Sequence, residues 1–413
     1  MSIVSRTSNS ESRPPDFESR IPNPESRLFT PRFFLMCGFN FSVFLAAFQL
    51  FPTAPFRILA LGGTEATAGL FLGFMTYASA VAAPFTGALA DRVGKRHVLV
   101  VSSLAAALFS ATYAVTTSIA VMLSLVAVHG VFWSALLTAS GAYLADIIPA
   151  HRRAEGMGYY GLSTMLAIAI APSIGLGVYR LGWPAVCLSA LILDVTMAVI
   201  AYRLPDDRTA AVQHGPFTLR RALEWRVMAV AITMFLYAFG YGGITSFAAL
   251  YATSNGVSPA GIYFMVFAAT SMTAGVVTGP LGDRIGHTRL LAPALLLIAT
   301  GYSLLAAGGT RGLLVASAIV FGVGFRSAYQ FFTAHVLHHV QPSRRGAAFG
   351  GILAALDTGI GSGSIVMGGI IDRYGFRHAY ATAACLALAA IPYFYVVSRI
   401  VWSSDFRLKP EAT

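Results

Sequence analysis

Twelve long apolar runs constrain the fold of this chain of 413 residues more than any other feature. Each run is about long enough to cross a bilayer as a helix, which takes roughly 20 residues, and none has the alternating pattern of membrane β-strands. Charged residues make up only 11% of the chain, against roughly 25% in a soluble protein, so a soluble enzyme is excluded. The sequence therefore predicts an all-α membrane protein with twelve transmembrane helices. The runs lie at about 33–55, 67–90, 97–116, 119–144, 154–178, 183–204, 226–252, 259–282, 288–307, 313–340, 344–371 and 377–402.

The two halves of the chain repeat each other at a constant offset of 192 residues. The segment GALADRVG at 87–94 matches GPLGDRIG at 279–286, and the arginine pair at 152–153 matches the pair at 344–345. Parallel repeats of six helices are typical of one class of transporters. We therefore expect two pseudo-symmetric six-helix bundles. The expected segments are a disordered tail at 1–31, bundles at 32–204 and 226–402, a cytoplasmic linker at 205–225 and a tail at 403–413.

Lys and Arg residues set the expected orientation in the membrane. With the N-terminus inside, the inside segments hold 22 of the 28 and the outside loops hold five. Because cytoplasmic loops are enriched in Lys and Arg, we predict that both termini are cytoplasmic, in the inner membrane of a bacterium. The net charge of +11 comes from short clusters between apolar runs, which is unlike the basic surface of a nucleic-acid-binding protein. We therefore expect no nucleic acid as a partner.

The segment GALADRVGKR at 87–96 resembles the motif between the second and third helices of the major facilitator superfamily. The resemblance implies that Asp91 lies at the N-terminus of the eleventh helix, near Arg344, where the helix dipole favours a carboxylate. It also implies that Arg92 pairs with Asp146 at the end of the fourth helix. Together these contacts form a latch that closes the inner side while the outer side is open.

The remaining motif residues extend this interpretation. Gly87 lets the second helix approach a neighbouring backbone closely, and Gly94 follows in the turn. The second copy supplies Asp283 and Arg284 for a symmetric latch against the start of the fifth helix. His338 stands where the first half has an aspartate, so we expect the second latch to be weaker.

Two charged residues, Arg326 and Asp357, lie about 13 positions into consecutive predicted helices. At about 1.5 Å per residue both are near the middle of the membrane, where an isolated charge is costly. We therefore expect a direct pair, in which Asp357 titrates and Arg326 binds an anionic or zwitterionic group of the substrate. A static ion pair is the alternative. Asp194 and His129 are further candidates for proton coupling.

The family's fold implies a central cavity lined by the first, fourth, seventh and tenth helices. Helical spacing groups polar and aromatic residues on one face of each of these helices. We expect these faces to bind substrate, with ordinary packing as the alternative for the aromatic residues. The predicted binding residues are Asn40, Phe44, Trp133, Tyr237, Tyr241, Thr245, Arg326, Tyr329 and Gln330.

Two further sequence patterns resemble those of cofactor or metal sites. The G-x-G-x-x-G spelling at 156–161 has no preceding strand, so it does not indicate a dinucleotide site. His335, His338 and His339 have a spacing that can hold a metal, but a helix end favours solvated interface residues. We expect no cofactor, no bound metal and no enzymatic activity.

The leading hypothesis is a secondary active transporter that exports a small organic molecule in exchange for protons, acting as a monomer in the bilayer. The segments at 241–247 and 357–359 resemble efflux and metallophore-exporter-like members of the superfamily. Val126 stands where many proton-coupled drug exporters carry an arginine. The chain therefore departs at this position from the standard exchange of drug for protons. The alternatives are proton-coupled uptake of a sugar or organic acid, metallophore export, and a non-transporting membrane receptor or scaffold.

Overall fold

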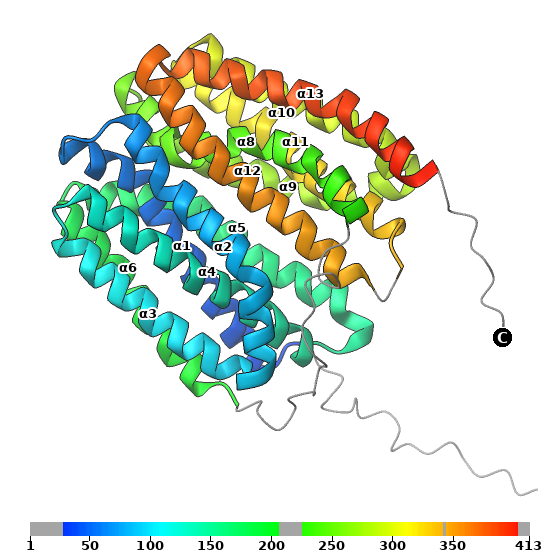
Figure 1. Ribbon diagram of the computed structural model, residues 1–413, viewed down its shortest axis with the longest axis horizontal. Helices are drawn as coiled ribbons and strands as arrows, with labels where there is room; N and C mark the ends of the chain where they lie inside the picture. The colour runs from blue at the N-terminus through cyan, green and yellow to red at the C-terminus, as the bar shows by residue number, and fades with distance from the viewer. Residues whose placement is uncertain (1–27, 206–224, 342–343, 404–413) are drawn as a thin grey trace, which may run out of the picture.

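The computed structural model describes residues 28–205, 225–341 and 344–403. In that part of the chain, twelve helices are long and apolar enough to cross a membrane, which confirms the prediction of twelve spans (Figure 1). Most of the tail predicted at 1–31, of the linker predicted at 205–225 and of the tail predicted at 403–413 lies outside the described residues. The helices are α1 (Pro31–Ala60), α2 (Glu65–Val93), α3 (Lys95–Val115), α4 (Ile119–Ile147), α5 (Arg153–Tyr179), α6 (Trp183–Arg203), α8 (Trp225–Ser254), α9 (Ile262–Ile285), α10 (His287–Ala307), α11 (Arg311–His338), α12 (Arg345–Tyr374) and α13 (Phe376–Ser403), with a short 3-10 turn at Ala150–Arg152.

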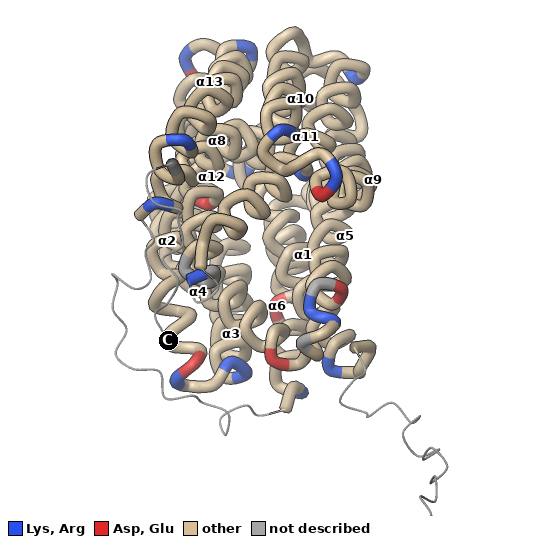
Figure 2. The backbone as a smooth tube through the Cα atoms, turned by 90° about the vertical axis from the view of Figure 1, so that its right-hand side faces the viewer, with Lys and Arg blue, Asp and Glu red and all other residues tan. Residues whose placement is uncertain are grey.

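The helices pack as two bundles of six, α1–α6 and α8–α13. The bundles meet mainly where α2 packs on α12, α5 on α9 and α1 on α8. The described chain enters α1 and leaves α13 on the same side of the molecule (Figure 1), which we call the inner side. Figure 2 shows that charged residues gather near helix ends and that few lie along the spans. This distribution fits helices surrounded by lipid, because a charge within the hydrocarbon is costly.

Gly94 and Gly286 show the internal repeat in the backbone itself. Gly94 ends α2 and begins α3 with φ 98° and ψ 130°, and Gly286 joins α9 to α10 with φ 100° and ψ 127°. Residues with a Cβ rarely adopt a positive backbone φ angle. The two glycines therefore make the same tight turn at corresponding positions of both bundles.

The outer halves of the two bundles are in close contact. On α2, Gly69 lies against the backbone of Ser364 on α12, and the Tyr77 hydroxyl lies 2.6 Å from the Ser362 hydroxyl. The inner halves of the same two helices separate (Figure 1). A Cβ built on Gly87 of α2 would find no neighbouring atom within 4 Å. The structure is therefore closed on the outer side and open on the inner side.

Candidate functional site

Arg326 lies near the middle of α11, with its side chain against α9. Its Nε is 2.9 Å from the position that a Cβ at residue 275 would occupy, so Gly275 provides the space for the guanidinium. The residues that the structure describes offer Arg326 no hydrogen bond or ion pair, and its side chain is only partly buried. A cation at this depth is thus available to a ligand.

Asp357 lies near the middle of α12, and its Oδ2 accepts a long hydrogen bond of 3.4 Å from the Ser79 hydroxyl of α2. The predicted direct pair with Arg326 is wrong, because no contact of 4.0 Å or less joins the two charges within the described residues. The reason is the packing, since α11 packs on α9 and α10 whereas α12 packs on α2 and α8. Both charges nevertheless act electrostatically on the Tyr329 hydroxyl. The two therefore face a common region from different helices.

Gln330 extends this site by one turn of α11. Its Oε1 accepts a hydrogen bond of 3.1 Å from the Thr278 hydroxyl of α9, and its Nε2 lies over Gly279. Gly275 and Gly279 together leave a groove on α9 for two polar side chains of α11. The role of these two glycines was not predicted from the sequence, although their Gly-x-x-x-Gly spacing is typical of close helix contacts. A separated cation and carboxylate, with amide and hydroxyl groups nearby, can bind a zwitterionic or anionic molecule.

Several residues predicted to bind substrate are instead buried in helix contacts. Asn40 is 2% exposed and donates from Nδ2 to the hydroxyls of Ser163 at 2.8 Å and Thr164 at 2.7 Å, which ties α1 to α5. Tyr237 is fully buried, and its hydroxyl donates to the Met234 sulfur at 2.6 Å. In this conformation these polar groups are satisfied within the protein, so the structure does not bring them to Arg326.

Tyr241 and Thr245 also lie inside the second bundle. The Tyr241 ring packs at 4.6 Å from the Phe325 ring and stacks on Phe321 at 6.0 Å. The Thr245 hydroxyl donates to the Tyr241 carbonyl at 2.8 Å, within its own helix. These contacts hold Tyr241 and Thr245 in the interior of the second bundle.

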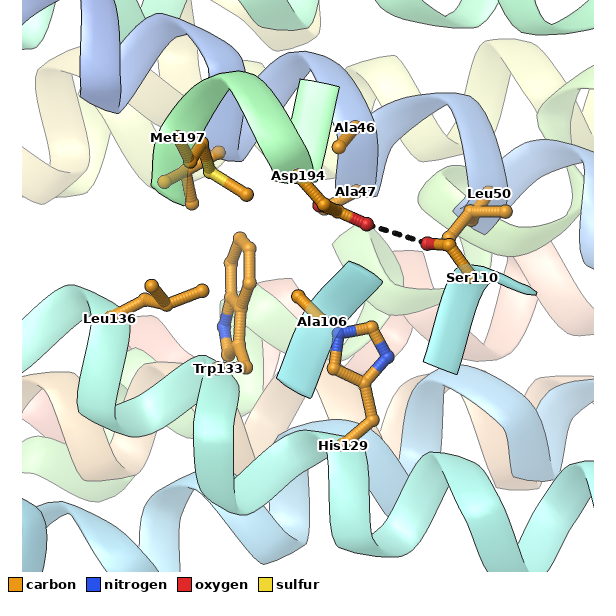
Figure 3. A pocket seen from close by; sticks show the side chains of 11 residues that line it. Ala46, Ala47, Leu50, Ala106, Ser110, His129, Trp133, Leu136, Asp194 and Met197 are labelled. Carbon is orange, nitrogen blue, oxygen red and sulfur yellow. Dashed lines mark hydrogen bonds between the residues drawn. The ribbon is translucent and has the colours of Figure 1, made fainter. Parts of the chain in front are cut away.

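The remaining predicted residues gather in the first bundle. Phe44 of α1 packs edge-on against Trp133 of α4 at 5.5 Å. Trp133, His129 and Asp194 line a small cavity between α1, α3, α4 and α6 (Figure 3). This second polar cluster is separate from the Arg326 and Asp357 site.

The latch contacts predicted for Asp91, Arg92 and Asp146 are not formed in this conformation. Asp146 forms an ion pair of 2.8 Å with Lys95, so the predicted pair with Arg92 is wrong here, because Lys95 at the start of α3 reaches the carboxylate. In the second half, Asp283 is exposed and lies 3.6 Å from His287 rather than at the start of α5. The described residues offer Asp91, Arg92 and Arg284 no hydrogen bond or ion pair. An unengaged latch is expected when the inner side is open.

The contact register of α2 and α12 indicates where Asp91 lies when the inner side closes. Position numbers in contact across this antiparallel pair add up to between 433 and 439, from Gly69 with Ser364 to Tyr77 with Ser362. Continuing this register places Asp91 opposite the start of α12, which begins at Arg345. The outer contacts thus independently support a meeting of Asp91 with the N-terminus of α12.

Comparison with known proteins identifies the family. A family model described as Major Facilitator Superfamily matches residues 34–258 and 230–411. The chain belongs to this superfamily. It is therefore a membrane transporter with twelve spans rather than an enzyme.

Among relatives in the superfamily, the staphylopine export protein of Staphylococcus aureus (strain Mu50 / ATCC 700699) is 23% identical over 355 residues, 81% of this chain and 88% of that protein. The quinolone resistance protein NorA of Staphylococcus aureus (strain MRSA252) is 24% identical over 218 residues, 52% of this chain and 56% of that protein. The crystal structure of the nucleoside transporter NupG has a TM-score of 0.74 at 15% identity and covers 90% of this chain and all of that one. The structural likeness shows the fold, and the names of the two sequence relatives refer to export of staphylopine and to quinolone resistance.

Proposed function

We propose that this protein exports a small anionic or zwitterionic organic molecule across the cytoplasmic membrane in exchange for protons. The observation that carries the proposal is the separation of Arg326 and Asp357, two opposite charges near the middle of the membrane without an ion-pair partner among the described residues. Each isolated charge costs at least about 2.5–3.5 kcal/mol at that depth. Groups with this cost are generally retained where a ligand or a proton binds.

In the proposed cycle, Arg326 binds a carboxylate or another anionic group of the substrate from the inner side. Asp357 takes up a proton from the outer side and releases it inside. The Ser79 hydroxyl contacts Asp357 closer to the inner side than the α2–α12 hydrogen bonds at Gly69 and Tyr77. The charge of this carboxyl therefore acts near the point where the two bundles separate. A change in its charge therefore biases the opening of the inner side.

Closure of the inner side would bring Asp91 to the N-terminus of α12 and engage the latch. The export direction is supported by the similarity to a staphylopine export protein. The excess of Lys and Arg in inner segments supports a cytoplasmic inner side, and the bacterial relatives support a bacterial cell membrane.

Uptake of an organic acid together with protons is the second candidate, because Arg326 would bind its carboxylate equally well. Similarity to a staphylopine export protein supports export of a metallophore as a narrower form of the leading proposal. Both concern the same site and differ from the leading proposal in direction or cargo.

The first experiment identifies the substrate by growth of a deletion strain on antibiotics, amino acids, organic acids and metal-limited media. Transport of that substrate is then measured with purified variants in proteoliposomes. We expect Asp357→Asn to abolish transport driven by a pH gradient while labelled substrate exchange survives. The matched control is Asp372→Asn, at an exposed position of the same helix.

Arg326→Ala should weaken substrate binding by about tenfold or more, because a charged hydrogen-bond partner contributes roughly 1.5–3 kcal/mol. Arg311→Ala, at the exposed start of the same helix, should leave binding unchanged. Full gradient-driven transport by a folded Asp357→Asn protein would contradict the proposed coupling.

A further inference from the structure

A small cavity lies inside the first bundle, away from the Arg326 and Asp357 site (Figure 3). Its walls come from α1, α3, α4 and α6 and are mostly apolar, and it has room for about one water molecule. Three side chains bring polar groups to it: Asp194, Ser110 and His129. A water molecule in such a space needs two to four polar partners, and this cavity offers them.

Asp194 supplies the acidic group of the cavity. Its side chain lies near the middle of α6 and is only 3% exposed. The Ser110 hydroxyl of α3 donates a hydrogen bond of 2.6 Å to its Oδ2. The described part of the chain provides no Lys or Arg in an ion pair with it. One hydroxyl does not replace the hydration of an ionised carboxylate in the bilayer, so this environment favours the protonated carboxyl.

His129 supplies a second titratable group from α4. It is 7% exposed, its ring stacks on Phe109 at 4.9 Å, and its Nδ1 lies 3.3 Å from the Tyr113 hydroxyl. Its Nε2 has no hydrogen-bond partner among the described residues, although the residue lines the cavity. A water molecule in this cavity could therefore serve as the hydrogen-bond partner of Nε2.

We propose that this cavity is a second proton-binding site, in which one water molecule joins the Asp194 carboxyl to the His129 imidazole. With one shared proton the pair is electrically neutral. Loss of that proton or gain of another leaves a net charge within the bilayer, so the two groups titrate as one unit. The site is thus suited to carry one proton.

The other titratable and charged groups nearby are few. Cys187 and Asp194 both lie close enough to Tyr113 to interact electrostatically with its hydroxyl. Helix α1 contributes only apolar side chains to the cavity wall. Arg57 acts on Cys187 from the outer end of α1, where its Nη2 donates to the Thr116 carbonyl at 3.0 Å. The proton therefore belongs to Asp194 and His129.

The role of this site in transport rests on the proton exchange proposed above. It carries one proton per cycle in addition to that of Asp357, and it releases this proton in the conformation that admits water to the cavity. Trp133 forms the wall toward Phe44 of α1, so movement of α1 against α4 is the step that opens the cavity.

Infrared spectroscopy of the full-length protein in lipid membranes tests the site without transport. The wild-type spectrum should contain the carbonyl band of a protonated carboxyl that is lost in Asp194→Asn and kept in Asp372→Asn. His129→Gln and Ser110→Ala should each shift this band, because the first replaces the basic imidazole by a neutral amide and the second removes the hydroxyl that donates to the carboxyl. A spectrum that Asp194→Asn leaves unchanged, or a band that His129→Gln does not move, would overturn the proposal.

Proton stoichiometry in proteoliposomes then tests the role in the cycle. Asp194→Asn should lower the ratio of protons to substrate by one while gradient-driven transport persists. An unchanged ratio in a folded protein would overturn the role in the cycle. If wild-type transport moves no protons at all, the proposed function fails, and the infrared result still decides whether the cavity holds a proton.

Discussion

Two glycines on the same helix should have opposite effects on the conformational equilibrium when each is replaced by alanine. Gly69 lies in the outer half of α2, and its backbone carbonyl accepts a hydrogen bond of 2.8 Å from the Ser364 hydroxyl of α12. A methyl group at residue 69 would collide with the Ser364 carbonyl oxygen and lie 3.2 Å from the Ile365 Cα. Because these are backbone atoms, α2 and α12 must move apart.

Overpacking of this kind typically costs about 1–3 kcal/mol. Gly69→Ala should therefore shift the ratio of inward-open to outward-open molecules about 5- to 150-fold toward the outward-open state, at about 1.4 kcal/mol per tenfold. Gly87→Ala adds the same methyl group where no atom lies within 4 Å. It should leave the inward-open state unaffected and penalise the outward-open state, in which the register of α2 and α12 brings this position into contact.

Pulsed electron paramagnetic resonance measures both effects. Spin labels at Leu181 and Tyr374, which are 82% and 65% exposed at the outer ends of the two bundles, report the outer separation after the three native cysteines are replaced. Gly69→Ala should increase the population of long distances, and Gly87→Ala should reduce it. A shift in the same direction for both variants, or none for Gly69→Ala, would refute the assignment of the α2–α12 contact to outer closure.

Asp91→Asn should increase the ratio of inward-open to outward-open molecules about two- to fivefold in the same spin-label assay, because an exposed carboxylate at a helix N-terminus contributes about 0.3–1 kcal/mol; an unchanged ratio would remove Asp91 from the latch. Gly275→Val should weaken substrate binding about tenfold in a binding titration with thermal stability retained, because the side chain occupies the space of the Arg326 guanidinium; unaltered affinity would contradict the placement of Arg326. Deletion of residues 2–27 should leave expression and transport near wild type, because this polar segment carries no apolar run; loss of either would show a targeting or docking role.

The number and type of helices could be predicted because membrane burial requires long apolar segments and leaves little choice of secondary structure. The ends of the helices were harder to predict from the sequence. The first apolar run was expected to stop near residue 55, but α1 continues to Ala60 with Pro52 and Pro55 inside it. Prolines are tolerated within transmembrane helices when neighbouring groups satisfy the freed backbone carbonyls, and a single sequence does not show those neighbours.

The depth of Arg326 and Asp357 could also be predicted, because it depends only on counting residues along a helix. Their separation could not, because helices adjacent in the chain need not pack together in the bundle. Asn40 illustrates the same limit, since helical spacing shows which face carries a polar group but not whether a hydroxyl on α5 meets it. Contacts between distant helices determine which polar residues remain available to a ligand.

Proton movement coupled to downhill substrate entry tests the proposed exchange most directly. Proteoliposomes are prepared without a pH gradient, the identified substrate is added outside, and the pH of the weakly buffered external medium is followed. Exchange of substrate for protons predicts that the external medium becomes more acidic as substrate enters, and that Asp357→Asn abolishes this change while Asp372→Asn does not. External alkalinisation would establish uptake together with protons, and substrate entry without any pH change would contradict proton coupling.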